Sequence, residues 1–238
     1  MEIYLDNSAT TKPYQEVVDK MVLALTTQYG NPSSIYKKGI EVEREIKEIR
    51  RNIARSLGAK ETEIYFTSGG TECNNTIIRS VANLNKKTKN HIISTVIEHP
   101  SVLNTLKDLE ADGFEVTYLP VGKDGKISLE DLKNAIKKET ILVSVMHVNN
   151  ETGIIQPVKE IGDALESKDI LFHVDATQSC GKLVDEIRGL KYNMLSFSAH
   201  KLMGPQGIGV LVLKKKKYKL PPVKNIMYGG QQEGGIRP

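Results

Sequence analysis

The chain lacks the features that mark secreted, membrane-spanning and metal-cluster proteins. Its 238 residues include only two cysteines, Cys73 and Cys180, too few for a disulfide framework or a metal cluster. No apolar run is long enough to cross a bilayer, and the opening MEIYLD is not a signal peptide. These absences predict a protein of a reducing, cytoplasmic setting with no membrane partner.

The net charge of the chain is also small. The chain has 33 Lys and Arg residues against 29 Asp and Glu, a net charge of +4. Its most visible basic feature is the lysine run at residues 214–217 with Lys219, and no basic helix face accompanies this run. A solvated junction between a strand and a loop explains the run better than a nucleic-acid-binding patch does. We therefore expect no nucleic-acid partner.

The chain is instead rich in alternating apolar and amphipathic segments. An arm at residues 1–13 precedes expected helices at about 13–28 and 36–57, the second with Ile46, Ile49, Ile53 and Leu57 facing inward. Apolar runs that predict strands occupy residues 63–67, 92–96, 116–119, 141–148, 170–174, 194–197 and 208–213. Helices are expected between them at 71–83 and 101–112, and from Ser128 and Pro157. This alternation predicts an α/β fold with a mostly parallel sheet between helices.

The stretch MLSFSAHKLMGPQGIG, residues 194–209, places Lys201 just past a strand. Two apolar runs around a Gly/Pro turn predict adjacent strands. An apolar base there partly desolvates the ammonium group of Lys201 and lowers its pKa, and a neutral amine can attack a carbonyl. A surface lysine that caps a strand is the alternative for this residue alone.

Other chemistry-bearing side chains also follow predicted strands, where parallel sheets bind ligands. The loop SGGTE, residues 68–72, could cradle one phosphate at a helix start, and a plain glycine-rich turn fits it as well. His99 could stack on a flat ligand or be a loop histidine. Asn150 is an amide at a strand exit. Asp175 and Gln178 follow another strand, and Asp175 could instead cap a helix.

These features together match the needs of pyridoxal 5′-phosphate. Its aldehyde needs a lysine, its pyridinium nitrogen a carboxylate, its phosphate a cradle and its ring a stacking partner. The combination, rather than any single residue, predicts this cofactor.

Seven motifs along the chain resemble those of one enzyme family. YLDNSATT, GNPSS, TSGGTECNN, EHPSV, HVNNETG, VDATQ and SFSAHKLMGPQGIG follow in order the motifs of the class V aminotransferase-like enzymes, above all the cysteine desulfurases. The resemblance implies the large domain of a fold type I pyridoxal-phosphate enzyme, formed by residues 14–238.

The same resemblance implies a role for each site residue. Lys201 would carry the cofactor, and His99 would stack on its ring and move protons. Asp175 would pair with the pyridine nitrogen and Gln178 would reach the ring hydroxyl. The phosphate would be held by Gly70, Thr71, Ser198 and His200, and Asn150 would lie beside the cofactor and the substrate carboxylate.

The implied activity converts L-cysteine to L-alanine and an enzyme-bound persulfide, for iron–sulfur cluster and thio-cofactor biosynthesis. The implied partners are a second copy of the chain and a sulfur-acceptor or iron–sulfur scaffold protein. Selenocysteine lyase, or another class V enzyme, is the alternative within the superfamily. A non-catalytic fragment that only holds the cofactor is the alternative outside it.

Members of this family continue into a smaller C-terminal domain, which carries the nucleophilic cysteine and an arginine for the substrate carboxylate. The present sequence stops at residue 238, inside a motif that normally ends in Gly-Thr and whose threonine reaches the phosphate of the neighbouring subunit. We therefore expect the C-terminal domain to be absent. We also expect neither Cys73 nor Cys180 to be the nucleophile.

Overall fold

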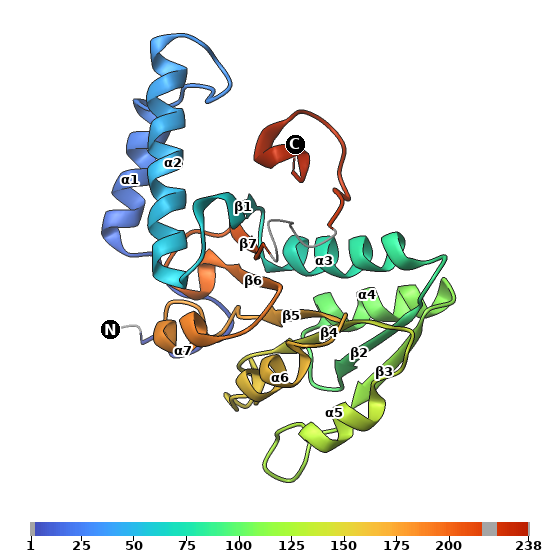
Figure 1. Ribbon diagram of the computed structural model, residues 1–238. Helices are drawn as coiled ribbons and strands as arrows, with labels where there is room; N and C mark the ends of the chain where they lie inside the picture. The colour runs from blue at the N-terminus through green and yellow to red at the C-terminus, as the bar shows by residue number, and fades with distance from the viewer. Residues whose placement is uncertain (1–2, 216–222, 238) are drawn as a thin grey trace.

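The computed structural model describes residues 3–215 and 223–237. Within them, a seven-stranded sheet lies between helices (Figure 1), which confirms the predicted α/β class. Lys216, Lys217 and Lys219 of the basic run lie outside the described residues. Lys214, at the start of the run, is half-buried with its ammonium group 4.4 Å from the centre of the Tyr192 ring.

The strand order in the sheet is β1-β7-β6-β5-β4-β2-β3. The strands are β1 (Ile64–Thr67), β2 (His91–Thr95), β3 (Glu115–Leu119), β4 (Thr140–Met146), β5 (Leu171–Asp175), β6 (Met194–Ser198) and β7 (Gly209–Leu213). Neighbours from β6 to β3 pair in parallel, whereas β7 runs antiparallel to both β1 and β6. The hairpin predicted around Lys201 is confirmed, since Phe197 of β6 pairs with Val210 of β7.

Helices cover both faces of the sheet. They are α1 (Gln15–Thr26), α2 (Lys37–Leu57), α3 (Gly70–Asn85), α4 (Pro100–Ala111), α5 (Leu129–Ala135), α6 (Val158–Leu165) and α7 (Val184–Gly189). On one face of the sheet, α3 and α4 pack around a hydrophobic core that includes Ile77 and Leu106. On the opposite face, α5, α6, α7 and the end of α2 pack around a second core that includes Ile161 and Phe172. The sequence did not predict α7, because its six residues carry too little periodicity to stand out from a loop.

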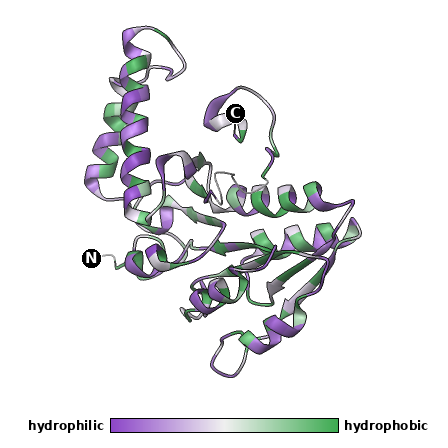
Figure 2. Ribbon diagram, viewed as in Figure 1, coloured by the Kyte–Doolittle hydropathy of each residue, from purple (hydrophilic) through white to green (hydrophobic). Residues whose placement is uncertain are grey.

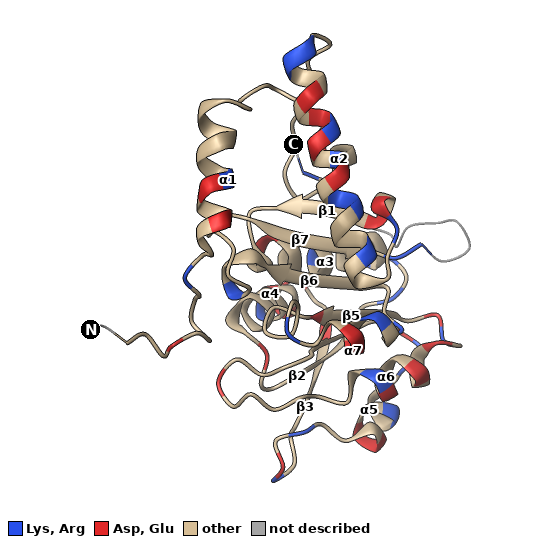
Figure 3. Cartoon of the chain, turned by 90° about the vertical axis from the view of Figure 1, so that its left-hand side faces the viewer, with Lys and Arg blue, Asp and Glu red and all other residues tan. Residues whose placement is uncertain are grey.

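The helices α1 and α2 project away from the sheet (Figure 1). Figure 2 shows that α2 is hydrophilic over most of its length, and Figure 3 shows acidic and basic residues along it. The prediction that its isoleucine stripe faces inward is wrong in part: Leu57 is buried, but Ile49 is 45% exposed. Periodicity identifies an apolar stripe but does not show what covers it. α1 likewise buries none of its residues.

Most predicted boundaries agree with the structure to within two residues. The strand predicted to reach residue 148 ends at Met146, because Val148 pairs only in an isolated bridge with Ile155. The predicted start at Ser128 is confirmed, since its hydroxyl accepts from the backbone N–H groups of Glu130 and Asp131, each at 3.2 Å.

Candidate active site

A cavity of about 710 Å³ opens at the carboxyl ends of the parallel strands, the edge where such sheets bind ligands. All nine predicted site residues line it: Gly70, Thr71, His99, Asn150, Asp175, Gln178, Ser198, His200 and Lys201. Segments far apart in the sequence therefore meet at one place. The structure gives their position, and their individual roles remain predictions.

Lys201 ends a single 3₁₀ turn, Ala199–Lys201, between β6 and β7. Its Nζ atom donates to the backbone carbonyl oxygens of Ser8 and Ala9, the second at 2.6 Å. Partial burial lowers the pKa of the Lys201 ammonium group, the charge of Lys182 lowers it further, and nearby acidic side chains oppose the shift. The desolvation expected at the strand end is present, so this lysine loses its proton more readily than an exposed one.

The segment before α1 forms one wall of the cavity, which the prediction of a simple arm missed. The backbone N–H of Thr11 donates to the carbonyl oxygen of His200 at 2.8 Å. Gln178 donates from Nε2 to the carbonyl oxygen of Ser8 at 2.9 Å, the same oxygen that Lys201 binds. The signal in the sequence was the motif YLDNSATT, whose small polar residues leave backbone carbonyl groups accessible.

The expected phosphate cradle lies where α3 begins at Gly70. Backbone N–H groups at a helix N-terminus attract an anion. A Cβ atom on Gly70 would lie 3.1 Å from Thr177 Oγ1, and one on Gly209 would lie 2.6 Å from the Cα atom of Gly69. The glycines therefore allow β7 and the loop to approach closely and leave the helix terminus open to a ligand.

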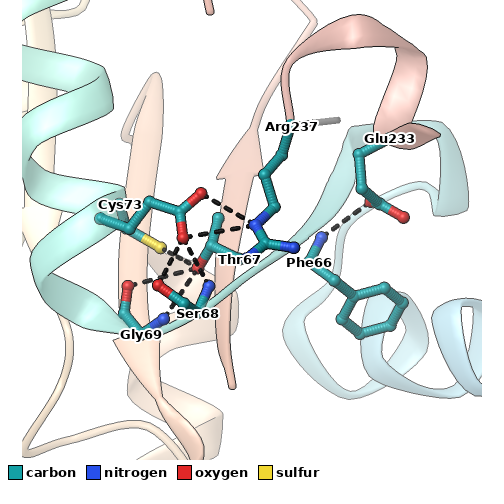
Figure 4. Close-up of polar contacts among 8 residues, drawn as sticks. Phe66, Thr67, Ser68, Gly69, Cys73, Glu233 and Arg237 are labelled. Atoms are coloured by element: carbon teal, nitrogen blue, oxygen red, sulfur yellow. Dashed lines mark hydrogen bonds and ion pairs between the residues drawn. The ribbon is translucent and has the colours of Figure 1, made fainter. Parts of the chain in front are cut away.

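A carboxylate beside this terminus is neutralised by an arginine. Glu72, in the first turn of α3, accepts from the backbone N–H of Ser68 at 2.7 Å and from its hydroxyl at 2.5 Å. Arg237 donates from Nε to the same carboxylate at 3.1 Å, and Figure 4 shows its side chain reaching the loop that carries Ser68. The ion pair offsets a negative charge that would oppose an anion in the cradle. No sequence pattern predicts this pair, because its members lie 165 residues apart.

Both cysteines are buried. Cys73 lies in the first turn of α3, with its Sγ atom 3.0 Å from Oγ1 of Thr67, the last residue of β1 (Figure 4). Burial raises the pKa of the Cys73 thiol to about 12, and that of Cys180 also to about 12. Since the thiolate is the reactive form of cysteine, neither side chain suits a nucleophile.

Asp175 is the last residue of β5 and is 5% exposed. Its Oδ2 atom accepts from Asn74 Nδ2 at 2.8 Å, and its Oδ1 atom accepts from the backbone N–H of Thr177 at 3.0 Å. The alternative that Asp175 caps a helix is wrong, because the next described helix, α7, begins at Val184. A carboxylate held by two N–H donors suits a cationic or protonated partner in the cavity.

His99 caps the N-terminus of α4 and remains exposed. Its Nδ1 atom accepts from the backbone N–H of Ser101 at 3.1 Å and lies 2.9 Å from the Ser101 hydroxyl. The ring is therefore fixed through one nitrogen and has an accessible face for a flat ligand. The position fits both interpretations of His99, since it is a loop residue that caps α4 and it also lines the same cavity as Asp175.

Two further predicted residues lie at the cavity with polar partners. Asn150 donates from Nδ2 to Glu151 Oε1 at 2.7 Å. His200 lies 3.1 Å, through Nδ1, from Thr10 Oγ1. Burial and then the adjacent Lys201 lower the pKa of His200, which favours its neutral form.

Glu98 is a buried acid next to the cavity that the sequence analysis did not single out. Its Oε1 atom accepts from Thr95 Oγ1 at 2.8 Å and from the backbone N–H of Met146 at 2.9 Å. Burial raises the pKa of the Glu98 carboxyl to about 8, and the charge of Asp175 adds to the effect. The sequence feature that could have identified Glu98 is its place in the EHPSV motif, as a charged residue directly before His99.

Known proteins resemble this chain in both sequence and structure. The family model Aminotransferase class-V matches residues 3–233. The cysteine desulfurase IscS of Clostridium botulinum is 45% identical over 236 residues, which are 99% of this chain and 58% of the relative. A solved structure of a NifS-like protein has a TM-score of 0.95 at 40% identity. The match covers 100% of this chain and 65% of the NifS-like chain. A structure of SspA in complex with cysteine has a TM-score of 0.92 at 38% identity. The match covers 99% of this chain and 67% of the SspA chain.

The chain thus spans 58% of the length of the curated desulfurase that it matches. The similarity extends over nearly all of the present residues, including the strands and turns that surround the cavity.

Proposed function

The chain belongs to the class V aminotransferase family, and we propose that it binds pyridoxal 5′-phosphate through Lys201 and acts in cysteine desulfuration. The observation that carries the proposal is the single cavity that Lys201, Asp175 and the glycine-bordered start of α3 share. The residues 14–238 are then the cofactor-binding domain, with residues 1–13 as the arm that closes one wall.

The residues of the cavity fit the chemical groups of this cofactor. A lysine with a lowered pKa suits the aldehyde, and a carboxylate held by two N–H donors suits the pyridinium nitrogen. A helix N-terminus kept open by glycine suits one phosphate. The exposed ring of His99 suits stacking on a flat heterocycle.

When bound, the cofactor supplies an electron sink for bond breaking at the substrate. The chain's own residues then bind, orient and move protons. Lys201 and His99 would exchange protons with the substrate, and Asp175 would hold the proton on the pyridine nitrogen.

The remaining cavity residues would orient the cofactor and the substrate. Gln178 would contact the ring hydroxyl and Asn150 the substrate carboxylate. The phosphate would be held by Gly70, Thr71, Ser198 and His200. His200 is favoured as a neutral hydrogen-bond donor there because burial lowers its pKa.

The proposed substrate is L-cysteine and the proposed product L-alanine. The matched relative is a cysteine desulfurase, and the similar SspA structure contains cysteine. Breaking the carbon–sulfur bond transfers the sulfur to an accepting thiolate, and the carbon skeleton gains a proton. Since burial raises the pKa of Cys73 and Cys180 to about 12, we propose that these 238 residues do not supply that thiolate.

A second copy of the chain and a sulfur-acceptor or iron–sulfur scaffold protein are the proposed partners. Support for self-association comes from α1 and the residue before it, where apolar side chains are 39–76% exposed: Tyr14, Val18, Met21, Val22 and Leu25. Sedimentation at micromolar concentration tests this, with a dimer expected and a well-folded monomer counting against it. Among the described residues, no helix is long and apolar enough to span a membrane.

The proposal is tested by titrating the chain with pyridoxal phosphate and recording the visible absorbance. We expect a saturable band in the wild type that Lys201→Ala removes. Lys214→Ala is the matched control, because burial also lowers the pKa of Lys214 although it lies outside the cavity. A panel of cysteine, selenocysteine and serine, read as perturbation of the band, distinguishes the desulfurase from other class V enzymes.

A further inference from the structure

A hydrogen-bonded network of polar side chains extends from the wall of the cavity into the protein interior. Asn74 on α3 lies at its centre and is 1% exposed. Its Nδ2 atom donates to Asp175 Oδ2 at 2.8 Å and to Ser101 Oγ at 2.9 Å. Its Oδ1 atom accepts from the Ser196 hydroxyl at 2.6 Å. Beyond Ser196 lies the buried ring of His173, whose Nε2 atom is 3.0 Å from Ser196 Oγ.

The direction of each hydrogen bond follows from the groups involved. The ionised carboxylate of Asp175 only accepts, so the amide nitrogen of Asn74 faces it and the amide oxygen faces Ser196. The Ser196 hydroxyl gives its single proton to Asn74 and therefore accepts from His173 Nε2. His173 Nδ1 then accepts from the Ser144 hydroxyl, 2.9 Å away. Burial lowers the pKa of His173 to about 4, which agrees with a neutral ring.

A second branch of this network reaches His99. Ser101 Oγ accepts from Asn74 and lies 2.9 Å from Nδ1 of His99. The backbone N–H of Ser101 donates to Nδ1 at 3.1 Å, so this nitrogen is an acceptor and the neutral ring of His99 carries its proton on Nε2. The Ser101 hydroxyl therefore donates its proton to Nδ1.

We propose that Asn74 is a positioning residue that couples Asp175 to His99. Its carboxamide orients the carboxylate of Asp175 toward the pyridine nitrogen and, by donating to Ser101 Oγ, directs the Ser101 hydroxyl proton to Nδ1 of His99. The role of Asp175 rests on the proposed function. The tautomer of His99 is a property of the chain alone.

Packing by itself does not account for an amide at this position. Most other buried residues of α3 are apolar, among them Ile77, Ile78 and Val81, and the buried polar ones, Thr76 and Ser80, carry only a hydroxyl. A buried amide among them is costly unless its hydrogen bonds are made. Here both amide protons and the amide oxygen have partners, and the two acceptors of those protons both line the cavity.

Three variants separate the two branches. Asn74→Ala removes both, whereas Ser101→Ala removes only the hydroxyl that reaches His99. Asn75→Ala is the matched control, since it is the next residue on α3. Its amide donates to the carbonyl oxygens of Thr71 at 3.0 Å and of Ser101 at 3.4 Å, and accepts from Thr105 on α4. It therefore touches the backbone of Ser101 but not the hydroxyl that faces His99.

The first readout is the imidazole ¹⁵N spectrum of His99 in the chain without added cofactor. In Asn74→Ala and Ser101→Ala, we expect the Nδ1 resonance to shift away from its wild-type position as hydrogen bonds to it are lost or weakened. Asn75→Ala should keep the wild-type spectrum.

The second readout is the dissociation constant for pyridoxal phosphate, determined from the absorption band of the bound form. Asn74→Ala should bind about tenfold more weakly, because Asp175 loses a charge-assisted hydrogen bond. Ser101→Ala and Asn75→Ala should remain within about twofold of the wild type.

The proposal is overturned if Asn74→Ala matches Asn75→Ala in either readout, or if wild-type His99 carries its proton on Nδ1. If the wild type binds no cofactor, the proposed function fails, and the His99 spectra alone decide whether Asn74 acts on that residue. If the alanine variant does not fold, Asn74→Leu replaces it. That variant fills nearly the same volume without any hydrogen-bonding group, and it should weaken cofactor binding in the same direction.

Discussion

The guanidinium group of Arg50 on α2 binds the carboxylate of Glu233 through two hydrogen bonds of 2.9 and 2.7 Å. The two side chains are 19% and 16% exposed. Glu233 also accepts from the backbone N–H of Phe66 in β1 at 2.8 Å (Figure 4). Through Arg50 and the Phe66 N–H, Glu233 connects the last described segment, residues 223–237, to α2 and to β1, the strand that leads into the proposed phosphate cradle.

Removing this pair should destabilise the fold. Arg50→Ala leaves the mostly buried carboxylate of Glu233 with one remaining donor, so we expect a loss of about 2–3 kcal/mol in unfolding free energy. Urea denaturation followed by circular dichroism measures it. The matched control is Arg51→Ala, whose pair with Glu61 is 58% and 47% exposed and should contribute less than about 1 kcal/mol. Equal losses in the two variants would contradict a special role for the Arg50–Glu233 pair.

Glu98 should make stability depend on pH. Its folded pKa of about 8 lies above the ordinary value of 4.5, so the folded state keeps a proton that the unfolded chain loses. The stability contributed by this proton is fully present below about pH 4.5 and is lost as the pH rises through about 8. Glu98→Gln preserves the shape and does not titrate.

The unfolding free energy of the wild type should therefore fall relative to Glu98→Gln between these pH values, at up to about 1.4 kcal/mol per pH unit. Urea denaturation at a series of pH values gives both curves. Parallel curves across this range would show that the Glu98 carboxyl is ionised in the folded protein.

Cys73 and Cys180 should be unreactive in the folded chain. With both thiol pKa values raised to about 12, almost no thiolate forms at neutral pH. We expect Ellman's reagent to modify neither residue before unfolding and both after it. With a thiol reductant present, Cys73→Ala and Cys180→Ala should form alanine from cysteine no more slowly than the wild type. Rapid modification of either residue, together with loss of alanine formation in its variant, would identify it as the sulfur acceptor.

The sequence predicted the features that local patterns determine. Apolar runs around a Gly/Pro turn predicted the β6–β7 hairpin, and the register of Phe197 with Val210 confirms it. The rule that ligands bind at the carboxyl ends of parallel strands predicted that His99, Asp175 and Lys201 would lie together, and all three line one cavity. Their chemical roles are proposals still to be tested.

Features that depend on tertiary packing could not be predicted in this way. The bonds from Asn74 to Asp175 and from Arg50 to Glu233 join residues 101 and 183 positions apart. No periodicity in α3 marks Asn74 as different from a solvated amide. In the same way, the apolar stripe of α2 gave no indication that Ile49 would remain exposed.

The attachment of the cofactor to Lys201 is tested most directly by reducing the complex with borohydride and mapping the labelled peptide by mass spectrometry. The chain is saturated with pyridoxal phosphate, shown to be folded by circular dichroism, reduced and digested. We expect the pyridoxyl group on the peptide that contains Lys201, with no such label in Lys201→Ala and an unchanged label in Lys214→Ala. A label on a different lysine, or none in the folded and saturated wild type, would contradict the proposed site.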